Sequence, residues 1–207
     1  MGAMSPLRAL ILDYGDVLSR PQRADCVHAM AERLGVMLDA FRAAYWQHRR
    51  AYDAGLPAVD YWRRVLGTIG WNVQEPHAPA TIEWLVETDV ASWVEYRDGV
   101  WALARWFRAT GRRTAFLSNG VPEVVARIRA DRPLESWFDV VVVSSEVGVT
   151  KPDPRIFELC LERLAVEPGD ALFVDDRPEN VEAAERLGIR TLHFTGDDAV
   201  RRLRALL

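Results

Sequence analysis

Short runs of apolar and β-branched residues recur along the chain and predict buried β-strands. The runs are RALILDY (8–14), RTAFLSN (113–119), DVVVVSS (139–145), ALFVDD (171–176) and RTLHFT (190–195). Each run is short and lacks the alternation of polar and apolar residues that is typical of a strand with one solvent-exposed face. We therefore expect every one of these strands to be covered on both faces.

Amphipathic segments between these runs predict α-helices. They cover 98–111, 122–131, 153–165 and 177–188, and an initial proline or a terminal glycine marks their boundaries. Strands that alternate with helices predict a parallel sheet with helices packed on both faces. The pattern therefore predicts a doubly wound, five-stranded α/β fold.

A long stretch from about residue 20 to residue 96 interrupts this alternation. It contains four helical patterns and no convincing strand, so we expect an all-helical insert after the first strand. Its pairs Arg49–Arg50 and Arg63–Arg64 are expected on solvated faces. Aromatic residues at helical spacing usually form a helical core, although they can also line a substrate cavity. Those of the insert include Tyr45, Trp46, Trp62, Trp84 and Trp93.

The composition narrows the possible functions. The 207 residues are 49% hydrophobic, with a formal net charge of −4, which predicts a globular protein of one or two domains. No basic stripe is present, so nucleic acid is not expected as a partner. No apolar run approaches the roughly 18 residues of a membrane span, and no secretory signal pattern is seen. Cys26 and Cys160 lie in helical patterns and are expected to be buried, reduced thiols, which fits a cytoplasmic location.

Polar residues gather where the predicted strands end. In an open parallel sheet, ligands bind beyond the carboxyl ends of the strands. The residues found there are Asp13, Gly15 and Asp16 after the first strand, Ser118, Asn119 and Gly120 after the second, Lys151 shortly after the third, and Asp175 and Asp176 after the fourth.

The carboxylates of Asp13, Asp175 and Asp176 are therefore expected to converge in one crevice. Two like charges about 4 Å apart repel by roughly 4 kcal/mol at an effective dielectric constant near 20. Such a cluster needs a cation, and oxygen ligands without a neighbouring His or Cys favour Mg²⁺ over zinc. Lys151 would add a further positive charge to the crevice.

The same residues carry a family resemblance. The segments LDYGDVL around Asp13, FLSNG around Ser118, TKPDPRIF around Lys151 and FVDDRPENVEAAERLG around the two acids resemble the four motifs of the haloacid dehalogenase-like (HAD) hydrolase superfamily in order and spacing. The resemblance spans nearly the whole chain. It implies a Rossmann-like core and a helical cap of the small type found in phosphatases of sugar phosphates and other small metabolites.

The resemblance also implies a domain division and a function. The core would comprise residues 4–20 and 96–207, and the cap residues 21–95. The expected reaction is Mg²⁺-dependent hydrolysis of a small phosphorylated metabolite through an aspartyl-phosphate. The identity of that phosphate ester would be decided in the cap, where no motif is readable, and the oligomeric state stays open.

Catalytic and substrate-binding roles follow from the resemblance residue by residue. Asp13 would be the nucleophile that attacks phosphorus. Ser118 and the amide groups of Asn119 and Gly120 would hold the phosphate oxygens. Lys151 would offset the charge of both the nucleophile and the phosphate, as lysines do in other phosphoryl-transfer sites.

The metal site implied by the resemblance comprises Asp13, Gly15, Asp175 and Asp176. Of the paired acids, Asp176 most resembles the direct Mg²⁺ ligand, whereas Asp175 would act through water or by holding Lys151. Gly15 would contribute its backbone carbonyl oxygen.

One position departs from the family pattern. Members commonly carry Asp-x-Asp at the first motif, and the second Asp serves as general acid and later as general base. Gly15 occupies that position here, and Asp16 follows one residue late, where a side chain normally points away from its neighbour's face. The acid/base role therefore does not transfer to Asp16, and slow turnover is expected, since general acid–base catalysis is typically worth about 10²–10⁴ in rate.

Two other functions remain open at this point. A metal-independent 2-haloacid dehalogenase would share Asp13, Ser118 and Lys151 but would not need the pair of acids at residues 175 and 176. A binding or regulatory module that has lost turnover through Gly15 would keep the same fold.

Overall fold

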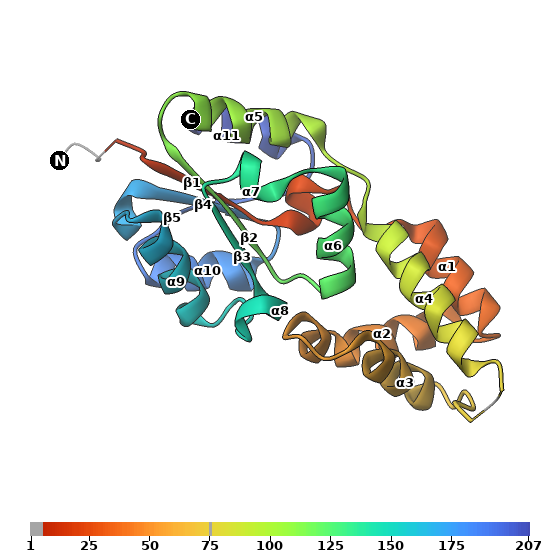
Figure 1. The fold of residues 1–207 in the computed structure, drawn as a ribbon. Helices are drawn as coiled ribbons and strands as arrows, with labels where there is room; N and C mark the ends of the chain where they lie inside the picture. Colours follow the sequence, from red (N-terminus) through yellow and green to blue (C-terminus); the bar gives the residue numbers. More distant parts are fainter. Residues whose placement is uncertain (1–5, 75) are drawn as a thin grey trace.

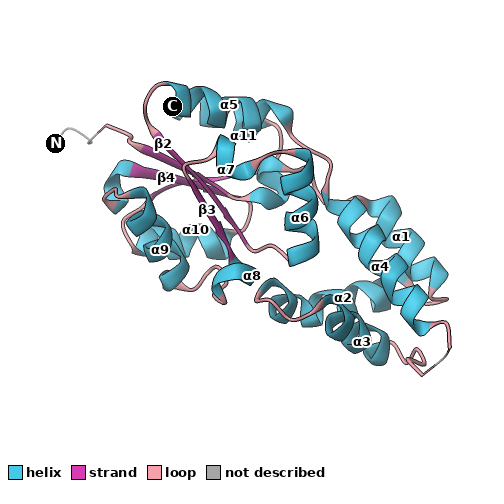
Figure 2. Cartoon of the chain, in the orientation of Figure 1, coloured by secondary structure: helices cyan, strands magenta, loops and turns pink. Residues whose placement is uncertain are grey.

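A five-stranded parallel sheet forms the centre of the larger part of the molecule in a computed structural model, which describes residues 6–74 and 76–207 (Figures 1 and 2). The strand order is β3-β2-β1-β4-β5. The strands are β1 (Ala9–Leu12), β2 (Arg113–Ser118), β3 (Val140–Val143), β4 (Ala171–Asp175) and β5 (Arg190–His193). All five predicted strands and the doubly wound class are thus confirmed.

The register of the sheet brings the strand ends together. Leu12 at the end of β1 pairs with Phe116 of β2 on one side and with Val174 of β4 on the other. The residues that follow these positions, Asp13 and Asp175 among them, therefore leave the sheet side by side at its carboxyl edge.

Helices cover both faces of the sheet because successive strand residues point to opposite sides. Leu10 and Leu12 belong to one core cluster with α5 and α6, whereas Ala9 and Ile11 belong to a second cluster with α9 and α10. The core helices are α5 (Asp98–Ala109), α6 (Pro122–Asp131), α7 (Leu134–Trp137), α8 (Ser144–Val147), α9 (Pro154–Leu164), α10 (Pro178–Arg186) and α11 (Asp198–Leu206). The four predicted core helices are confirmed, and α7, α8 and α11 are additional.

The insert between β1 and α5 consists of four helices in the described residues. They are α1 (Ala24–Arg33), α2 (Leu38–Asp53), α3 (Ala58–Thr68) and α4 (Ala78–Trp93). Figure 1 shows this four-helix unit beside the core, with α2 facing the carboxyl edge of the sheet. Aromatic rings fill its interior, and the rings of Tyr52 and Tyr61 stack at 4.2 Å. The division into a core and a cap at the stated residues stays a prediction, and residues 4, 5 and 75 lie outside the described part.

The two connections between core and helical unit run side by side. The Arg20 N–H donates to the Glu95 carbonyl at 2.7 Å, and the Arg97 N–H donates to the Leu18 carbonyl at 2.9 Å. An isolated antiparallel bridge joins Ser19 to Tyr96 between them. These bonds fix where the helical unit leaves and re-enters the core.

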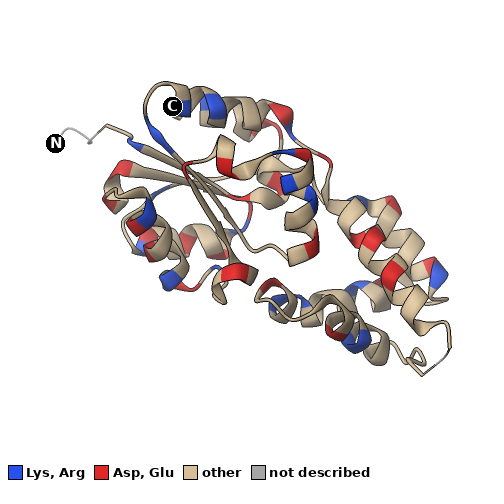
Figure 3. Cartoon of the chain, viewed as in Figure 1, with Lys and Arg blue, Asp and Glu red and all other residues tan. Residues whose placement is uncertain are grey.

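The expectations for the cysteines, for membrane-spanning helices and for the charge distribution have different outcomes. Both cysteines are free, as expected, but only Cys160 is buried, because Cys26 lies at the partly exposed start of α1. No helix among residues 6–74 and 76–207 has the length and apolar character needed to span a membrane. Acidic and basic residues are interspersed over both parts of the molecule (Figure 3). The expected absence of a nucleic-acid partner stays a prediction.

Candidate active site

A buried lysine lies at the centre of the carboxyl edge of the sheet. The Nζ atom of Lys151 lies 2.6 Å from Asp13 Oδ1 and 2.7 Å from Asp175 Oδ2. It also donates a hydrogen bond to the Leu117 carbonyl oxygen at 3.0 Å. Burial by itself would lower the pKa of Lys151, but the two carboxylates outweigh it and the pKa is raised. The ammonium group is therefore charged, and all three of its donors are used.

Asp175 is committed to protein partners on both oxygens. Besides Lys151, it accepts the Arg177 N–H at 2.8 Å and the Asn180 amide group at 3.0 Å to each oxygen. Its side chain has no exposed surface. Asp175 thus holds Lys151 in place, one of the two alternatives that the sequence left open for it.

Asn180 is a site residue that the sequence interpretation missed. It lies on the first turn of α10, five residues after the end of β4, where the turn of the chain brings it back over Asp175. In the sequence it is one polar residue among several at the start of the helical segment RPENVEAAERLG, and nothing there marks it as a partner of Asp175.

Asp176 faces the cavity beside the nucleophile candidate. One carboxylate oxygen each of Asp13, Asp175 and Asp176 lie within 4.8 Å of one another. Burial and the charge of Asp175 raise the pKa of Asp176 to about 6. Burial likewise raises the pKa of Asp13, an effect that Lys151 opposes. Three carboxylates against one ammonium group leave a formal charge of −2, which matches a divalent cation.

The loop after β2 has two anchors. The side-chain amide of Asn119 exchanges hydrogen bonds with the main chain of Lys151, donating to its carbonyl at 2.9 Å and accepting its N–H at 2.8 Å. The Gly120 N–H donates to Ser144 Oγ at 3.1 Å. A Cβ atom at Gly120 would lie only 2.9 Å from Val125 Cγ2, so the close packing of the loop requires glycine. Ser118 is buried at the start of this loop.

Gly15 and Asp16 differ in backbone conformation. Gly15 has φ −59° and ψ 127°, which any residue can adopt, and its Cβ position is 3.8 Å from the Trp93 ring and 3.9 Å from Asp13 Oδ2. Asp16 has φ 54°, in the left-handed region, and its Oδ1 lies 3.1 Å from Arg97 Nη2. Asp16 is therefore held in an ion pair with the residue that precedes α5.

A cavity of about 430 Å³ opens over these residues. The core contributes Asp13, Gly15, Ser118, Lys151 and Asp176, and the four-helix unit contributes Gln22, Arg42, Trp46, Arg49, Asp53 and Trp93. Trp46 and Trp93 thus line a cavity, whereas Trp62 is fully buried in the helical core. Across the cavity, the guanidinium carbon of Arg177 lies 5.6 Å from the centre of the Trp46 ring.

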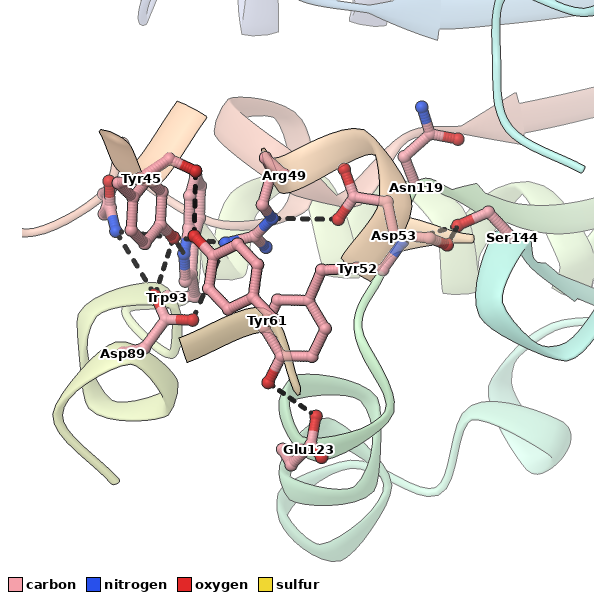
Figure 4. Close-up of polar contacts among 12 residues, drawn as sticks. Tyr45, Arg49, Tyr52, Asp53, Tyr61, Asp89, Trp93, Asn119, Glu123 and Ser144 are labelled. Carbon is pink, nitrogen blue, oxygen red and sulfur yellow. Dashed lines mark hydrogen bonds and ion pairs between the residues drawn. The ribbon is translucent and has the colours of Figure 1, made fainter. Parts of the chain in front are cut away.

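The expectation of a solvated Arg49 is wrong. Arg49 is 7% exposed and forms an ion pair with Asp53 at 2.9 Å between Nε and Oδ1 (Figure 4). Its Nη1 lies 3.6 Å from Asp89 Oδ2, and Tyr45 donates its hydroxyl to the other Asp89 oxygen at 2.7 Å. The charge is buried because α4 supplies Asp89, a partner far away in the sequence.

Comparison with known proteins confirms the family resemblance of the sequence. The family model of haloacid dehalogenase-like hydrolases matches residues 7–188. Phosphoserine phosphatase from Thermus thermophilus is 37% identical over 86 residues, 41% of this chain and 34% of that protein. (S)-2-haloacid dehalogenase 4A from Burkholderia cepacia is 26% identical over 197 residues, 91% of this chain and 83% of that protein.

Solved structures share the fold. A HAD family enzyme from Bacteroides thetaiotaomicron, in complex with magnesium and inorganic phosphate, superposes with a TM-score of 0.73 at 19% identity. The superposition covers 92% of this chain and 96% of that enzyme's chain.

The chain matches three further curated relatives over 9%, 36% and 57% of their own length. The chain thus spans less than two thirds of several relatives that it matches.

Replacing Asn180 with alanine is expected to slow any turnover that depends on Lys151. The change removes the amide donor from both oxygens of the buried Asp175 and so loosens the carboxylate that orients the ammonium group. We expect the free energy of unfolding to fall by about 1–3 kcal/mol, with a drop in kcat of about tenfold. Glu179→Ala, at the exposed neighbouring position, is the control and should change neither quantity. Equal behaviour of the two variants in urea unfolding and steady-state assays would contradict this role of Asn180.

Proposed function

We propose that the chain, which belongs to the haloacid dehalogenase-like hydrolases, is a Mg²⁺-dependent phosphatase of small phosphorylated metabolites that works through an aspartyl-phosphate on Asp13. The observation that carries the proposal is the carboxylate of Asp176, which lies beside Asp13 and Asp175 although those two acids already share the single ammonium group of Lys151, so that the cluster keeps a formal charge of −2. The Thermus thermophilus phosphoserine phosphatase, 37% identical over the matched segment, supports the same activity class.

Asp13 is the proposed nucleophile. Its Oδ1 is paired with Lys151, which leaves the other oxygen available to attack. The other oxygen would form a bond to phosphorus while the bond from phosphorus to the leaving oxygen breaks, and that oxygen would take up a proton from solvent water, which the attacking water of the second step returns. Water would then attack the phosphorus atom, releasing inorganic phosphate and restoring the Asp13 carboxylate.

The remaining core residues would position the phosphoryl group. The Ser118 hydroxyl and the backbone N–H of Asn119 are proposed to donate to its oxygens, while Lys151 offsets their charge. The Gly120 N–H is bonded to Ser144, so it would reach a phosphate oxygen only by leaving that partner. The main contribution of Gly120 is therefore the tight turn that its missing Cβ permits.

The donor set fits a magnesium ion. It consists of carboxylate oxygens carrying the formal charge of −2 that is left after pairing with Lys151, and no histidine or cysteine of residues 6–74 and 76–207 belongs to the cluster. We propose that Asp13, Asp176 and the carbonyl oxygen of Gly15 would hold the ion, with Asp175 contributing by holding Lys151. When bound, Mg²⁺ supplies charge stabilisation to the transferring phosphoryl group.

A metal-independent dehalogenase is the second candidate. The Burkholderia cepacia dehalogenase aligns with 91% of this chain, more than the phosphoserine phosphatase does. Asp13, Ser118 and Lys151 would serve that reaction equally well. The charge of Asp176 beside the nucleophile would then be uncompensated, and for this reason we favour the phosphatase.

The metal requirement separates the two candidates. The protein is expected to release phosphate from p-nitrophenyl phosphate with Mg²⁺ and to stop when a chelator removes it, because Asp176 and Asp13 repel both each other and the substrate without a cation. Asp176→Ala should raise the Mg²⁺ concentration for half-maximal rate about tenfold. Chloride release from 2-chloropropionate in excess chelator, with no phosphate release under any condition, would instead establish the dehalogenase.

Asp13→Asn is expected to abolish hydrolysis. The amide keeps the shape of the side chain but lacks the anionic nucleophile, so kcat should fall by about 10³-fold or more. Stopped turnover with an unchanged far-ultraviolet circular dichroism spectrum is the expected result. A variant that retains the parent rate would exclude Asp13 as the nucleophile.

Gly15→Asp tests the missing acid/base carboxylate. The backbone at Gly15 accepts any residue, and the new Cβ would make ordinary contacts with Trp93 and Asp13. Turnover of alkyl phosphates should rise, by up to about 10²-fold, because their leaving oxygen needs a proton, whereas p-nitrophenyl phosphate should gain less. No gain on alkyl phosphates in a folded, Mg²⁺-binding variant would indicate that another group, such as Asp16, Asp53 or the substrate itself, already transfers the proton.

A further inference from the structure

The hydroxyl group of Ser144 joins the loop after β2 to the four-helix unit. Ser144 Oγ accepts a hydrogen bond from the Gly120 N–H at 3.1 Å and donates one to the carbonyl oxygen of Asp53 (Figure 4). An N–H can only donate and a carbonyl oxygen can only accept, so the two partners fix the direction of the hydroxyl proton. Ser144 is fully buried, and neither bond can be replaced by bulk water without opening the structure.

On the helical side, Ser144 binds the end of α2. Asp53 is the last residue of this helix, and a carbonyl at this position lacks a partner within the helix. The carboxylate of the same residue holds Arg49 inside the cavity. The backbone and the side chain of Asp53 therefore connect the core to the surface that would contact the leaving group of a substrate.

Two further contacts hold α2 against the core at this point. The Tyr52 hydroxyl donates to Glu123 Oε2 on α6 at 2.8 Å. Gly55 has φ 102°, and a Cβ there would lie 3.0 Å from the Ser145 carbonyl oxygen, so the turn after α2 approaches α8 as closely as glycine allows. Docking of α2 is thus a specific fit rather than a loose apposition.

On the core side, Ser144 fixes Gly120. The neighbouring Asn119 is tied to the main chain of Lys151, and Val125 closes off the space beside Gly120. Two sets of hydrogen bonds hold this loop. Those between Asn119 and Lys151 lie wholly within the core, whereas the bond between Gly120 and Ser144 involves a hydroxyl group that also binds Asp53 of the helical unit. Departure of α2 would leave the hydroxyl proton of Ser144 without its acceptor and free the group to rotate.

We propose that Ser144 is a positioning residue that couples docking of α2 on the core to the geometry of the Ser118–Gly120 loop. The inference rests on the proposed function, in which this loop holds the phosphoryl group. Because coupling between two binding events is reciprocal, phosphate on the loop stabilises the docked α2, and docked α2 strengthens phosphate binding. The Ser118–Gly120 loop thereby keeps both of its polar anchors only while α2 is docked on the core.

Calorimetric binding of inorganic phosphate in the presence of Mg²⁺ tests the coupling without turnover. The variants are Ser144→Ala, Tyr52→Phe, which weakens docking without touching the loop, and the double variant. Ser145→Ala is the matched control. Ser145 is next to Ser144 in the sequence, and its hydroxyl oxygen is also buried but has no hydrogen-bond partner among the described residues. Hydrogen exchange of the amides of residues 50–56, with and without phosphate, reports the docking of α2.

Ser144→Ala is expected to raise the dissociation constant of phosphate about tenfold, and Tyr52→Phe to raise it about threefold, in line with the loss of two hydrogen bonds in the first variant and of one in the second. The double variant should bind no more weakly than Ser144→Ala, because the coupling is already lost. Phosphate should slow exchange at residues 50–56 in the parent and in Ser145→Ala, but not in Ser144→Ala.

Three results would overturn the coupling in a protein that hydrolyses phosphate esters. These are unchanged phosphate affinity in Ser144→Ala, effects of Ser144→Ala and Tyr52→Phe that multiply in the double variant, and phosphate-slowed exchange that persists without the Ser144 hydroxyl. If Ser144→Ala does not fold, Tyr52→Phe alone decides, since unchanged phosphate affinity there also contradicts the coupling. A parent protein that neither releases nor binds phosphate contradicts the proposed function itself.

Discussion

The site depends on the ion pairs that the ammonium group of Lys151 forms with Asp13 and Asp175. The ammonium group is buried between the two carboxylates, and the three groups would each be costly to bury alone. Removing one member of a buried ion pair typically costs about 3–5 kcal/mol, since the other charge is left uncompensated. One ammonium group faces three carboxylates, so the pairing that stabilises the core leaves the formal charge of −2 at which the proposed Mg²⁺ would bind.

The sheet makes this arrangement possible. Parallel pairing of β1 with β4 places Asp13 next to Asp175, and the chain beyond β3 returns Lys151 to the same edge. The four-helix unit then covers that edge with paired charges and aromatic rings rather than with a second cluster of free charge. Arg49, which lines the cavity, is paired with both Asp53 and Asp89.

The strands, the helical insert and the convergence of the acids could be predicted from the sequence, because strand ends of a parallel sheet meet at one edge. Contacts between side chains that are far apart in the sequence could not be predicted. The burial of Arg49 depends on Asp89, and the ion pair of Asp16 depends on Arg97, each far along the chain. The helix α11 was missed although Ala199 and Leu203 carry the apolar spacing of one, since it follows the last strand and lacks a clear cap.

The most direct test of the account is the chemical identity of the reaction intermediate. The protein should be mixed with Mg²⁺ and a phosphate ester, quenched in acid during turnover and analysed by peptide mass spectrometry. The account predicts a phosphoryl group on the peptide that carries Asp13, absent when Asp13 is replaced by asparagine. Turnover with no phosphoryl group on that peptide, or with one on a different residue, would contradict it.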